Sequence, residues 1–276
     1  STRTAGIEIS GSAAAHDGSA GSGPDGGTSA GPVGTATAGP VGGEKVVTLE
    51  GPDGVEEIRV DEILVSVGRA PNVDGLGLEE AGVDYDGRKG VTVNDYLQTS
   101  NRRVYAAGDI ASPYKFTHVA DAQAAIVIQN ALFLRTKKAS SLIVPWTTYT
   151  DPEVAHVGLY PADAADRGIE TDTFISTLAE NDRAMLDGEA DGLVEVYTKR
   201  GTDAIVGATV VASHAGEMIG ELTVAMEAGA GLSTISSTIH PYPTQSDAIR
   251  KAAREYYKSR LTPRIKRLIE RWMAWH

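Results

Sequence analysis

The sequence contains no cysteine, few aromatic residues and fewer cations than anions. Its 276 residues include 25 Lys and Arg against 37 Asp and Glu, which gives a formal net charge of −12, and only 6% are aromatic. The missing thiols exclude disulfides, thiolate zinc sites and a cysteine nucleophile on this chain, and we predict no metal site. The excess of acid argues against nucleic-acid binding, because phosphate recognition needs clustered cations.

Long hydrophobic runs are also missing. No apolar segment approaches the ~20 residues that span a bilayer, and the N-terminal residues lack the profile of a signal peptide. We therefore expect a cytoplasmic protein that does not engage a membrane. The acid excess, with 9 Lys against 16 Arg, indicates either an ordinary self-repelling surface or a halophile-like adaptation to a high-salt cytosol.

Residues 11–43 contain 11 Gly among 33 positions and almost no large apolar side chain. Such a segment cannot bury enough surface to offset the entropy of ordering it, so we predict a flexible insertion. Alternating apolar residues predict short strands on both sides, at 7–9 and at 46–49. The turn sequence at 51–54 then predicts a hairpin whose second strand is 55–60.

Two apolar stretches, Ile63 to Val67 and Val104 to Ala107, predict buried strands, the second closed by Gly108 and Asp109. Residues 118–134 hold apolar side chains at helical spacing without Gly or Pro, which predicts a long helix.

The pattern changes at Pro145, where strands become grouped with helices, as is typical of an α+β domain. We predict strands at 155–159, 173–177, 193–198 and 205–211, and helices at about 215–229 and 244–261.

Residues 263–276 predict a short amphipathic helix, because Pro263 stands in its first turn and its apolar residues form one stripe. We expect this stripe to pack on the parent chain or on a dimer mate, since the chain is too acidic to favour anionic lipid. The stripe consists of Ile265, Leu268, Ile269, Trp272 and Met273.

Four segments occur in an order that resembles one known family. They are SVGRAPN at 66–72, TSNRRVYAAGD at 99–109, TDPEVAHVG at 150–158 and HPYPTQSDAIRKAA at 240–253. One such segment would be weak, whereas four in order with sensible gaps are specific. Over roughly residues 44–262 the chain resembles the flavin-dependent pyridine nucleotide-disulfide oxidoreductases, which include mercuric reductase and dihydrolipoyl dehydrogenase.

The resemblance implies FAD and NAD(P)H as cofactors, and an α/β plus α+β fold in which a remnant of the NAD(P)/FAD Rossmann-type domains precedes an α+β dimerisation domain. It divides the chain into four parts. Residues 1–72 would be the tail of the NAD(P)-binding domain with the insertion, 73–144 the C-terminal part of the FAD-binding domain, 145–262 the dimerisation domain and 263–276 a C-terminal helix.

The features of the family's front half are missing from this sequence. No Gly-rich turn stands between an apolar strand and a helix, where it would cradle a dinucleotide phosphate. The family's paired redox cysteines cannot exist without cysteine. We therefore expect the front half to be missing from this chain or supplied by another polypeptide.

Five residues are candidates for the cofactor side of a site. A buried strand that ends in Gly108-Asp109 puts a carboxylate where doubly wound folds bind ligands. The resemblance makes Asp109 the acceptor of a hydrogen bond from the ribityl chain of FAD; an Asp that caps a turn is the alternative. The resemblance places the helix start at the flavin ring, where the free backbone N–H groups of Thr117 and His118 would stabilise negative charge on the reduced ring. The resemblance places Gly68 near the nicotinamide; the alternative is that Gly68 and Pro71 only shape a turn.

The most informative departure from the family lies at 240–247. In its disulfide reductases, a His directly before Pro-Thr, held by a Glu five positions later, acts as acid/base at the partner subunit's redox thiol. Here Tyr242 takes the first position and Asp247 the second, an arrangement that resembles mercuric reductases. His240 is the alternative catalytic group, but Pro241 and its offset along an extended segment give its side chain a different reach.

These patterns predict an FAD-dependent NAD(P)H oxidoreductase that acts on a disulfide or a metal ion, as a homodimer whose two subunits complete each site. Mercuric reductases commonly carry a C-terminal cysteine pair, which this chain lacks, so a dihydrolipoyl dehydrogenase-like protein stays an alternative. The missing cysteines and Gly-rich turns leave a further alternative, a non-catalytic dimerisation or scaffold subunit or a truncated product.

Overall fold

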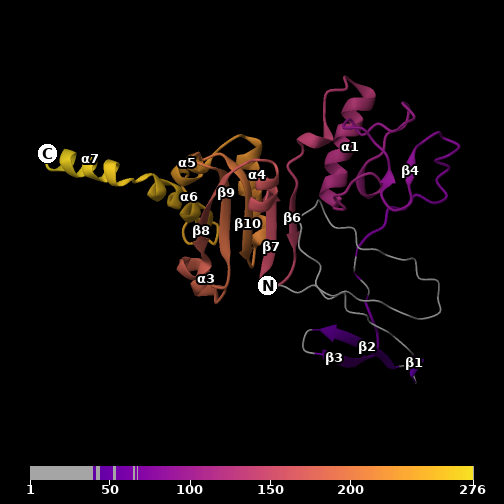
Figure 1. The fold of residues 1–276 in the computed structure, drawn as a ribbon, viewed down its shortest axis with the longest axis horizontal. Coiled ribbons are helices and arrows are strands. Elements are labelled where there is room, and N and C mark those ends of the chain that lie inside the picture. Colours follow the sequence, from indigo (N-terminus) through magenta and orange to yellow (C-terminus); the bar gives the residue numbers. More distant parts are fainter. Residues whose placement is uncertain (1–39, 42–43, 52–53, 65, 67, 276) are drawn as a thin grey trace. The chain divides into compact units, whose positions relative to one another are not determined.

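The chain divides into two compact units, residues 1–115 and 116–276 (Figure 1). The computed structural model describes residues 40–41, 44–51, 54–64, 66 and 68–275. The predicted strand at 7–9 therefore lies outside the described residues, as does most of the predicted insertion. The last described part of that insertion forms strand β1, Pro40–Val41.

The first unit contains the predicted hairpin. Strand β2, Glu44–Gly51, pairs antiparallel with β3, Gly54–Val60, so that Gly51 lies opposite Gly54, and β1 pairs with the outer edge of β2. The predicted hairpin is confirmed, because the last residue pair of the two strands is Gly51 and Gly54, the two ends of the predicted turn sequence.

The prediction of a buried strand from Ile63 to Val67 is wrong for its described residues. Ile63, Leu64 and Ser66 belong to no strand, and the Leu64 side chain is 91% exposed. A strand needs neighbours to pair its backbone N–H and C=O groups. Among the described residues, no neighbouring strand pairs with this segment.

The second predicted buried strand, Val104 to Ala107, is also wrong. Only an isolated bridge between Gln98 and Tyr105 forms there. Val104 and Ala106 instead pack against a small core of buried valines (Val73, Val83 and Val91). Two short strands, β4 at Tyr85–Asp86 and β5 at Gly90–Val91, pair beside this core, and the 3-10 helix η1 covers Gly108–Ile110.

Helix α1, Thr117–Leu132, confirms the helix predicted at 118–134. Its buried residues, Val119, Gln123, Ile126 and Asn130, recur at spacings of four and three and so form one face. The chain turns back after α1, because the Asn130 amide donates to the Lys137 carbonyl (2.7 Å) and accepts from the Lys137 N–H (3.1 Å).

The second unit is built on a five-stranded antiparallel sheet with the order β6-β7-β10-β9-β8. Its four predicted strands are confirmed, each with at least one end shifted, and one short strand was not predicted. The bounds are β6 Pro145–Thr148, β7 Glu153–Gly158, β8 Thr171–Thr177, β9 Leu193–Lys199 and β10 Ile205–Ala212.

One face of this sheet forms the main core. Helix α4, Ala215–Glu227, packs on β6, β7 and β10, and helix α6, Asp247–Arg260, packs on β8 and β9. The strand residues beneath them alternate along each strand, as a sheet with one buried face requires. They are Ala155, Val157, Phe174, Val194, Val196, Ala208, Val210 and Ala212.

Short elements that the sequence analysis did not predict link the strands and helices. They are the 3-10 turns η2 Ala139–Ser141 and η3 Leu178–Glu180, and the six-residue helices α2 Pro161–Asp166, α3 Asp182–Asp187 and α5 Leu232–Ser237. Helix α7, Pro263–Met273, confirms the predicted C-terminal helix. All side chains described from Leu261 to Trp275 are exposed. The structure therefore does not show the expected packing of the apolar stripe on the parent chain, and packing on a dimer mate stays a prediction.

Gly158 of β7 should tolerate no larger residue, because the neighbouring strand β10 lies too close to it. Its φ is +82°, and a Cβ there would collide with the Val206 carbonyl oxygen of β10. We predict that Gly158→Ala lowers the free energy of unfolding by at least ~2 kcal/mol, because strain and overlap add. The matched control is Gly168→Ala, where φ is +71° but the space is open, with an expected cost of ~1 kcal/mol. Urea unfolding checks the difference; equal costs would contradict it.

On the other sheet face, His156 makes stability depend on pH. Its ring stacks on Tyr160 at 3.7 Å, and burial lowers its pKa below the ordinary 6.5. The unfolded chain therefore binds this proton more readily, so the free energy of unfolding falls as the pH drops through that value. We predict that the free energy of unfolding of His156→Gln decreases less than that of the wild type between about pH 7 and about pH 5.5. Unchanged pH dependence in urea titrations would contradict this assignment.

Candidate functional site

The candidate cofactor residues Gly108 and Asp109 lie in the η1 turn of the first unit. Gly108 is buried with φ +78°, a conformation that favours glycine. Lys115 closes the turn, because its Nζ donates to the Asp109 carbonyl at 2.9 Å. Strand β5 approaches so closely that a Cβ on Gly90 would collide with the Ile110 carbonyl oxygen. No hydrogen bond among the described residues uses the Asp109 carboxylate, which leaves it able to accept one from a ligand hydroxyl.

Gly68 lies in the same unit, in the segment that leads toward this turn. It is exposed, with φ +150° and open space around the position of a Cβ. Its neighbour Arg69 donates from Nη1 to the Lys115 carbonyl at 3.4 Å. The segment after Gly68 is thereby tied to the end of the loop that carries Asp109.

Thr117 and His118 begin α1, in the second unit. No side chain caps this helix at Phe116, and the N–H groups of Thr117 and His118 donate to no described acceptor. They have the free donors of a helix start. The His118 side chain is already committed, since Nε2 bonds the Pro145 carbonyl (2.8 Å) and the ring stacks on Phe116. His118 therefore offers its backbone rather than its ring.

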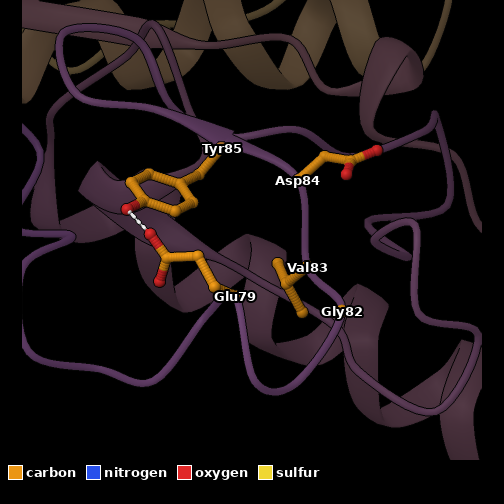
Figure 2. Close-up of a pocket in the computed structure, with 5 residues that line it drawn as sticks. All are labelled: Glu79, Gly82, Val83, Asp84 and Tyr85. Carbon is orange, nitrogen blue, oxygen red and sulfur yellow. Dashed lines mark hydrogen bonds between the residues drawn. The ribbon is translucent and has the colours of Figure 1, made fainter.

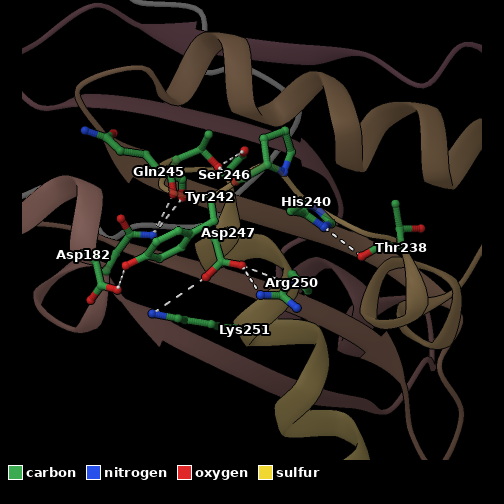
Figure 3. A network of polar contacts seen from close by, with 12 residues as sticks. Asp182, Thr238, His240, Tyr242, Gln245, Ser246, Asp247, Arg250 and Lys251 are labelled. Atoms are coloured by element: carbon green, nitrogen blue, oxygen red, sulfur yellow. Dashed lines mark hydrogen bonds and ion pairs between the residues drawn. The ribbon is translucent and has the colours of Figure 1, made fainter.

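The other candidate group is the segment between α5 and α6, which carries His240 and Tyr242 (Figure 3). Tyr242 is 72% exposed, and its hydroxyl donates to the Asp182 carboxylate at 2.8 Å. Asp182 is the first residue of α3, so a residue sixty positions earlier in the chain orients the phenol. Sequence reasoning missed Asp182, because no motif connects α3 to this segment.

His240 is placed differently. Its side chain is 5% exposed, Nε2 bonds the Glu221 carboxylate of α4 at 2.8 Å, and Nδ1 bonds the Thr238 carbonyl at 3.1 Å. Both ring nitrogens are therefore committed to acceptors within the unit. This arrangement makes His240 a packing and anchoring residue in this structure, while Tyr242 presents its hydroxyl at the surface.

Asp247 begins α6 and is nearly buried. Its carboxylate receives two hydrogen bonds from Arg250 on the same helix, at 2.5 and 2.8 Å, and Lys251 lies 3.9 Å away. In Figure 3 the Tyr242 hydroxyl is bonded to Asp182, whereas Asp247 is bonded to Arg250. The catalytic assignment of Asp247, taken from its spacing, stays a prediction.

The backbone that follows Tyr242 is held by buried amides. Asn181 caps α3 by accepting from the Ala184 N–H (3.0 Å), and its amide donates to the carbonyls of Thr244 and Gln245 (3.1 and 3.3 Å). The Gln245 amide in turn donates to Glu189 at 2.7 Å. One asparagine thus connects α3, which carries Asp182, to the segment that carries Tyr242.

The carboxylate beside Tyr242 changes the acidity of its phenol. The hydrogen bond to Asp182 and the negative charge of Asp182 raise the pKa of Tyr242 above its usual 10, with a smaller contribution from the charge of Asp247. The phenol is therefore neutral at physiological pH, with its proton on Oη. Such a group acts as a hydrogen-bond donor rather than as a base.

A separate shallow pocket lies in the first unit (Figure 2). Its lining contains none of the predicted site residues and consists of Glu79, Gly82, Val83, Asp84 and Tyr85. Within the described part of the chain, no three His, Cys, Asp or Glu side chains are grouped to hold a metal ion. Nor does any described helix combine the length and apolar character needed to cross a membrane.

Two family models match the chain. Residues 144–253 match "Pyridine nucleotide-disulphide oxidoreductase, dimerisation domain", and residues 34–124 match "Pyridine nucleotide-disulphide oxidoreductase". The second unit's sheet with α4 and α6 lies almost entirely within the first match, and the η1 turn lies within the second.

Curated and solved relatives agree. The chain is 36% identical to mercuric reductase of Streptomyces lividans over 78% of its length and 45% of the relative's. It is 40% identical to dihydrolipoyl dehydrogenase of Thermus scotoductus, with 77% and 46% covered. The crystal structure of LpdA from Mycobacterium tuberculosis superposes with a TM-score of 0.72 at 28% identity, with 81% of this chain and 48% of that one covered.

The chain belongs to the pyridine nucleotide-disulphide oxidoreductase family, as the four motifs predicted. It has a partial Rossmann-type pyridine nucleotide domain followed by the dimerisation domain, so the predicted fold class is confirmed. The chain spans about half the length of the curated relatives it matches.

The Tyr242 contact gives a direct test. We predict that Asp182→Asn lowers the pKa of Tyr242 toward the ordinary tyrosine value, because the neutral amide removes the charge that disfavours phenolate. Ultraviolet titration of Asp182→Asn, with Tyr242→Phe subtracted, isolates this one phenol among ten tyrosines. The control is Asp187→Asn, which changes a carboxylate of the same helix that pairs with Arg183. Equal titration of both variants would contradict the assignment.

Proposed function

We propose that this chain is part of an FAD-dependent NAD(P)H oxidoreductase that acts on a disulfide or a metal ion, most similar in chemistry to mercuric reductase. One observation carries the proposal. Tyr242, which the motif aligns with the family's acid/base residue, lies exposed on an anchored segment, while both ring nitrogens of the nearly buried His240 are bonded to Glu221 and Thr238. Tyr242, rather than His240, is the group that a partner's redox centre would meet.

The chemistry of a phenol favours a metal ion over a disulfide as the class of electron acceptor. Interconversion of a disulfide and a dithiol, such as lipoamide and dihydrolipoamide, requires a group that gives and takes thiol protons near neutral pH, a task suited to histidine. Tyr242 keeps its proton, because Asp182 raises its pKa. Its single O–H, which is donated to Asp182 in this structure, can serve an incoming thiolate, free or bound to a metal ion, when it turns from that carboxylate to the sulfur. A dihydrolipoyl dehydrogenase-like activity is the alternative.

Each unit offers groups that suit an FAD ligand. In the first unit, Gly108 has no side chain to obstruct a ligand and the Asp109 carboxylate has free acceptor capacity. In the second unit, the first N–H groups of α1, at Thr117 and His118, are free donors. We assign Asp109 to the ribityl hydroxyls, Thr117 and His118 to the flavin ring and Gly68 to the nicotinamide side. FAD, when bound, supplies the acceptor for a hydride from NAD(P)H. Without cysteine, this chain leaves the redox pair to another segment or polypeptide.

The proposed assembly is a cytoplasmic homodimer built through the dimerisation domain. We keep the division at residues 72, 144 and 262 as the proposed domain organisation. A separate polypeptide that supplies the N-terminal half is the proposed additional partner. The alternative, a non-catalytic scaffold subunit, rests on the absence of cysteine from this chain.

Flavin binding and mass test this proposal together. We expect the purified chain, incubated with FAD at high salt, to be a dimer by light scattering and to retain the visible flavin band after desalting. Asp109→Ala should lose the band but keep the dimer, and Asp84→Ala, an exposed carboxylate of the same unit, should keep both. A colourless dimer would support the scaffold alternative, and a colourless monomer would contradict both.

A further inference from the structure

Helix α7 begins without help from the rest of the fold. Thr262 caps it by accepting from the Ile265 N–H (3.4 Å), and Pro263 occupies the first helical position. The Arg267 side chain turns back to the Pro263 carbonyl at 3.3 Å, within the helix. The local sequence therefore defines where α7 starts.

The apolar residues of α7 share one face and are exposed. Ile265, Ile269 and Trp272 follow one another at spacings of four and three, with Met273 beside them. Trp272 and Met273 are 63% and 65% exposed, and Trp275 just after the helix is 90% exposed. Such a face is costly to leave in water, so it needs a cover.

The opposite face of α7 is cationic. Arg264, Lys266, Arg267 and Arg271 stand against a single carboxylate, Glu270, in a chain whose formal net charge is −12. At 100° per residue the cations occupy the arc opposite the apolar face, with Lys266 at one border and Arg264 and Arg271 toward the other. Positive charge is thus concentrated on a helix whose apolar side chains are exposed.

An anionic bilayer surface satisfies both faces at once. Acyl chains accept the apolar side chains, tryptophan prefers the interface, and lipid phosphates meet the flanking cations. A second copy of this chain would cover the apolar face too, but a pair of α7 helices would bring like-charged borders, Lys266 and Arg264, against each other. We propose that α7 docks this chain on anionic membrane surfaces.

The acidity of the chain, from which we expected no lipid binding, does not prevent this docking. Charges farther away than the Debye length, about 8 Å at physiological salt, are largely screened. Eleven helical residues extend about 16 Å from Thr262, so the last turn lies beyond that range. The local charge of α7 then determines its attraction to lipid.

Vesicle flotation of the full 276-residue chain tests the proposal. We expect flotation with vesicles of equal phosphatidylglycerol and phosphatidylcholine, and about tenfold weaker partition onto pure phosphatidylcholine. Ile269→Asp should abolish flotation and Arg271→Glu should weaken it about tenfold. The control Lys258→Glu makes the same charge change at an exposed position of α6 and should leave flotation unchanged. Unaltered circular dichroism and thermal unfolding would show that the variants are folded.

Three outcomes would overturn the proposal. The first is that the wild-type chain does not float, and the second is that Ile269→Asp floats like the wild type. The third is that the wild-type chain binds no lipid but has a larger mass by light scattering than Ile269→Asp. The last outcome would assign the apolar face of α7 to a second copy.

Discussion

The antiparallel sheet of the second unit must remove one face from water, and this constraint fixes the site as well as the core. Alternating small and β-branched residues give that face, and α4 and α6 cover it. Because α6 must lie over β8 and β9, residues 238–246 have to link α5 to the start of α6. Tyr242 lies on this linking segment, and Asn181 holds the segment to α3 through two backbone carbonyls.

The difference between His240 and Tyr242 is one of partners rather than of chemistry alone. Two residues apart, they have opposite environments, because α4 supplies Glu221 to the imidazole whereas α3 supplies Asp182 to the phenol. The Glu221 carboxylate occupies Nε2 of the nearly buried His240. The Asp182 carboxylate raises the pKa of the exposed Tyr242 and so keeps its phenol protonated. Motif spacing alone does not reveal such assignments, since both carboxylates come from other helices.

Local patterns predicted the elements that are amphipathic over many residues: the hairpin with its glycine turn, α1, four strands of the sheet, and α4, α6 and α7. They failed at Ile63 to Val67 and at Val104 to Ala107, where an apolar run indicates burial but pairing partners decide whether a strand forms. They also missed the six-residue helices, which are too short for a periodic signal. Motifs predicted Tyr242 and Asp109 as candidate site residues, while their neighbours Asp182, Asn181 and Lys115 were found only from three-dimensional proximity.

The two edges of the sheet are unequal. Strand β6 has four residues and begins with Pro145, which has no N–H to offer to another strand. Strand β8 has seven residues, contains neither proline nor lysine, and exposes Ile175, and among the described residues it pairs only with β9. Unprotected edges of this kind template pairing between chains. During heating or refolding at high concentration, aggregation would therefore begin along β8, and a single lysine there would act as a gatekeeper.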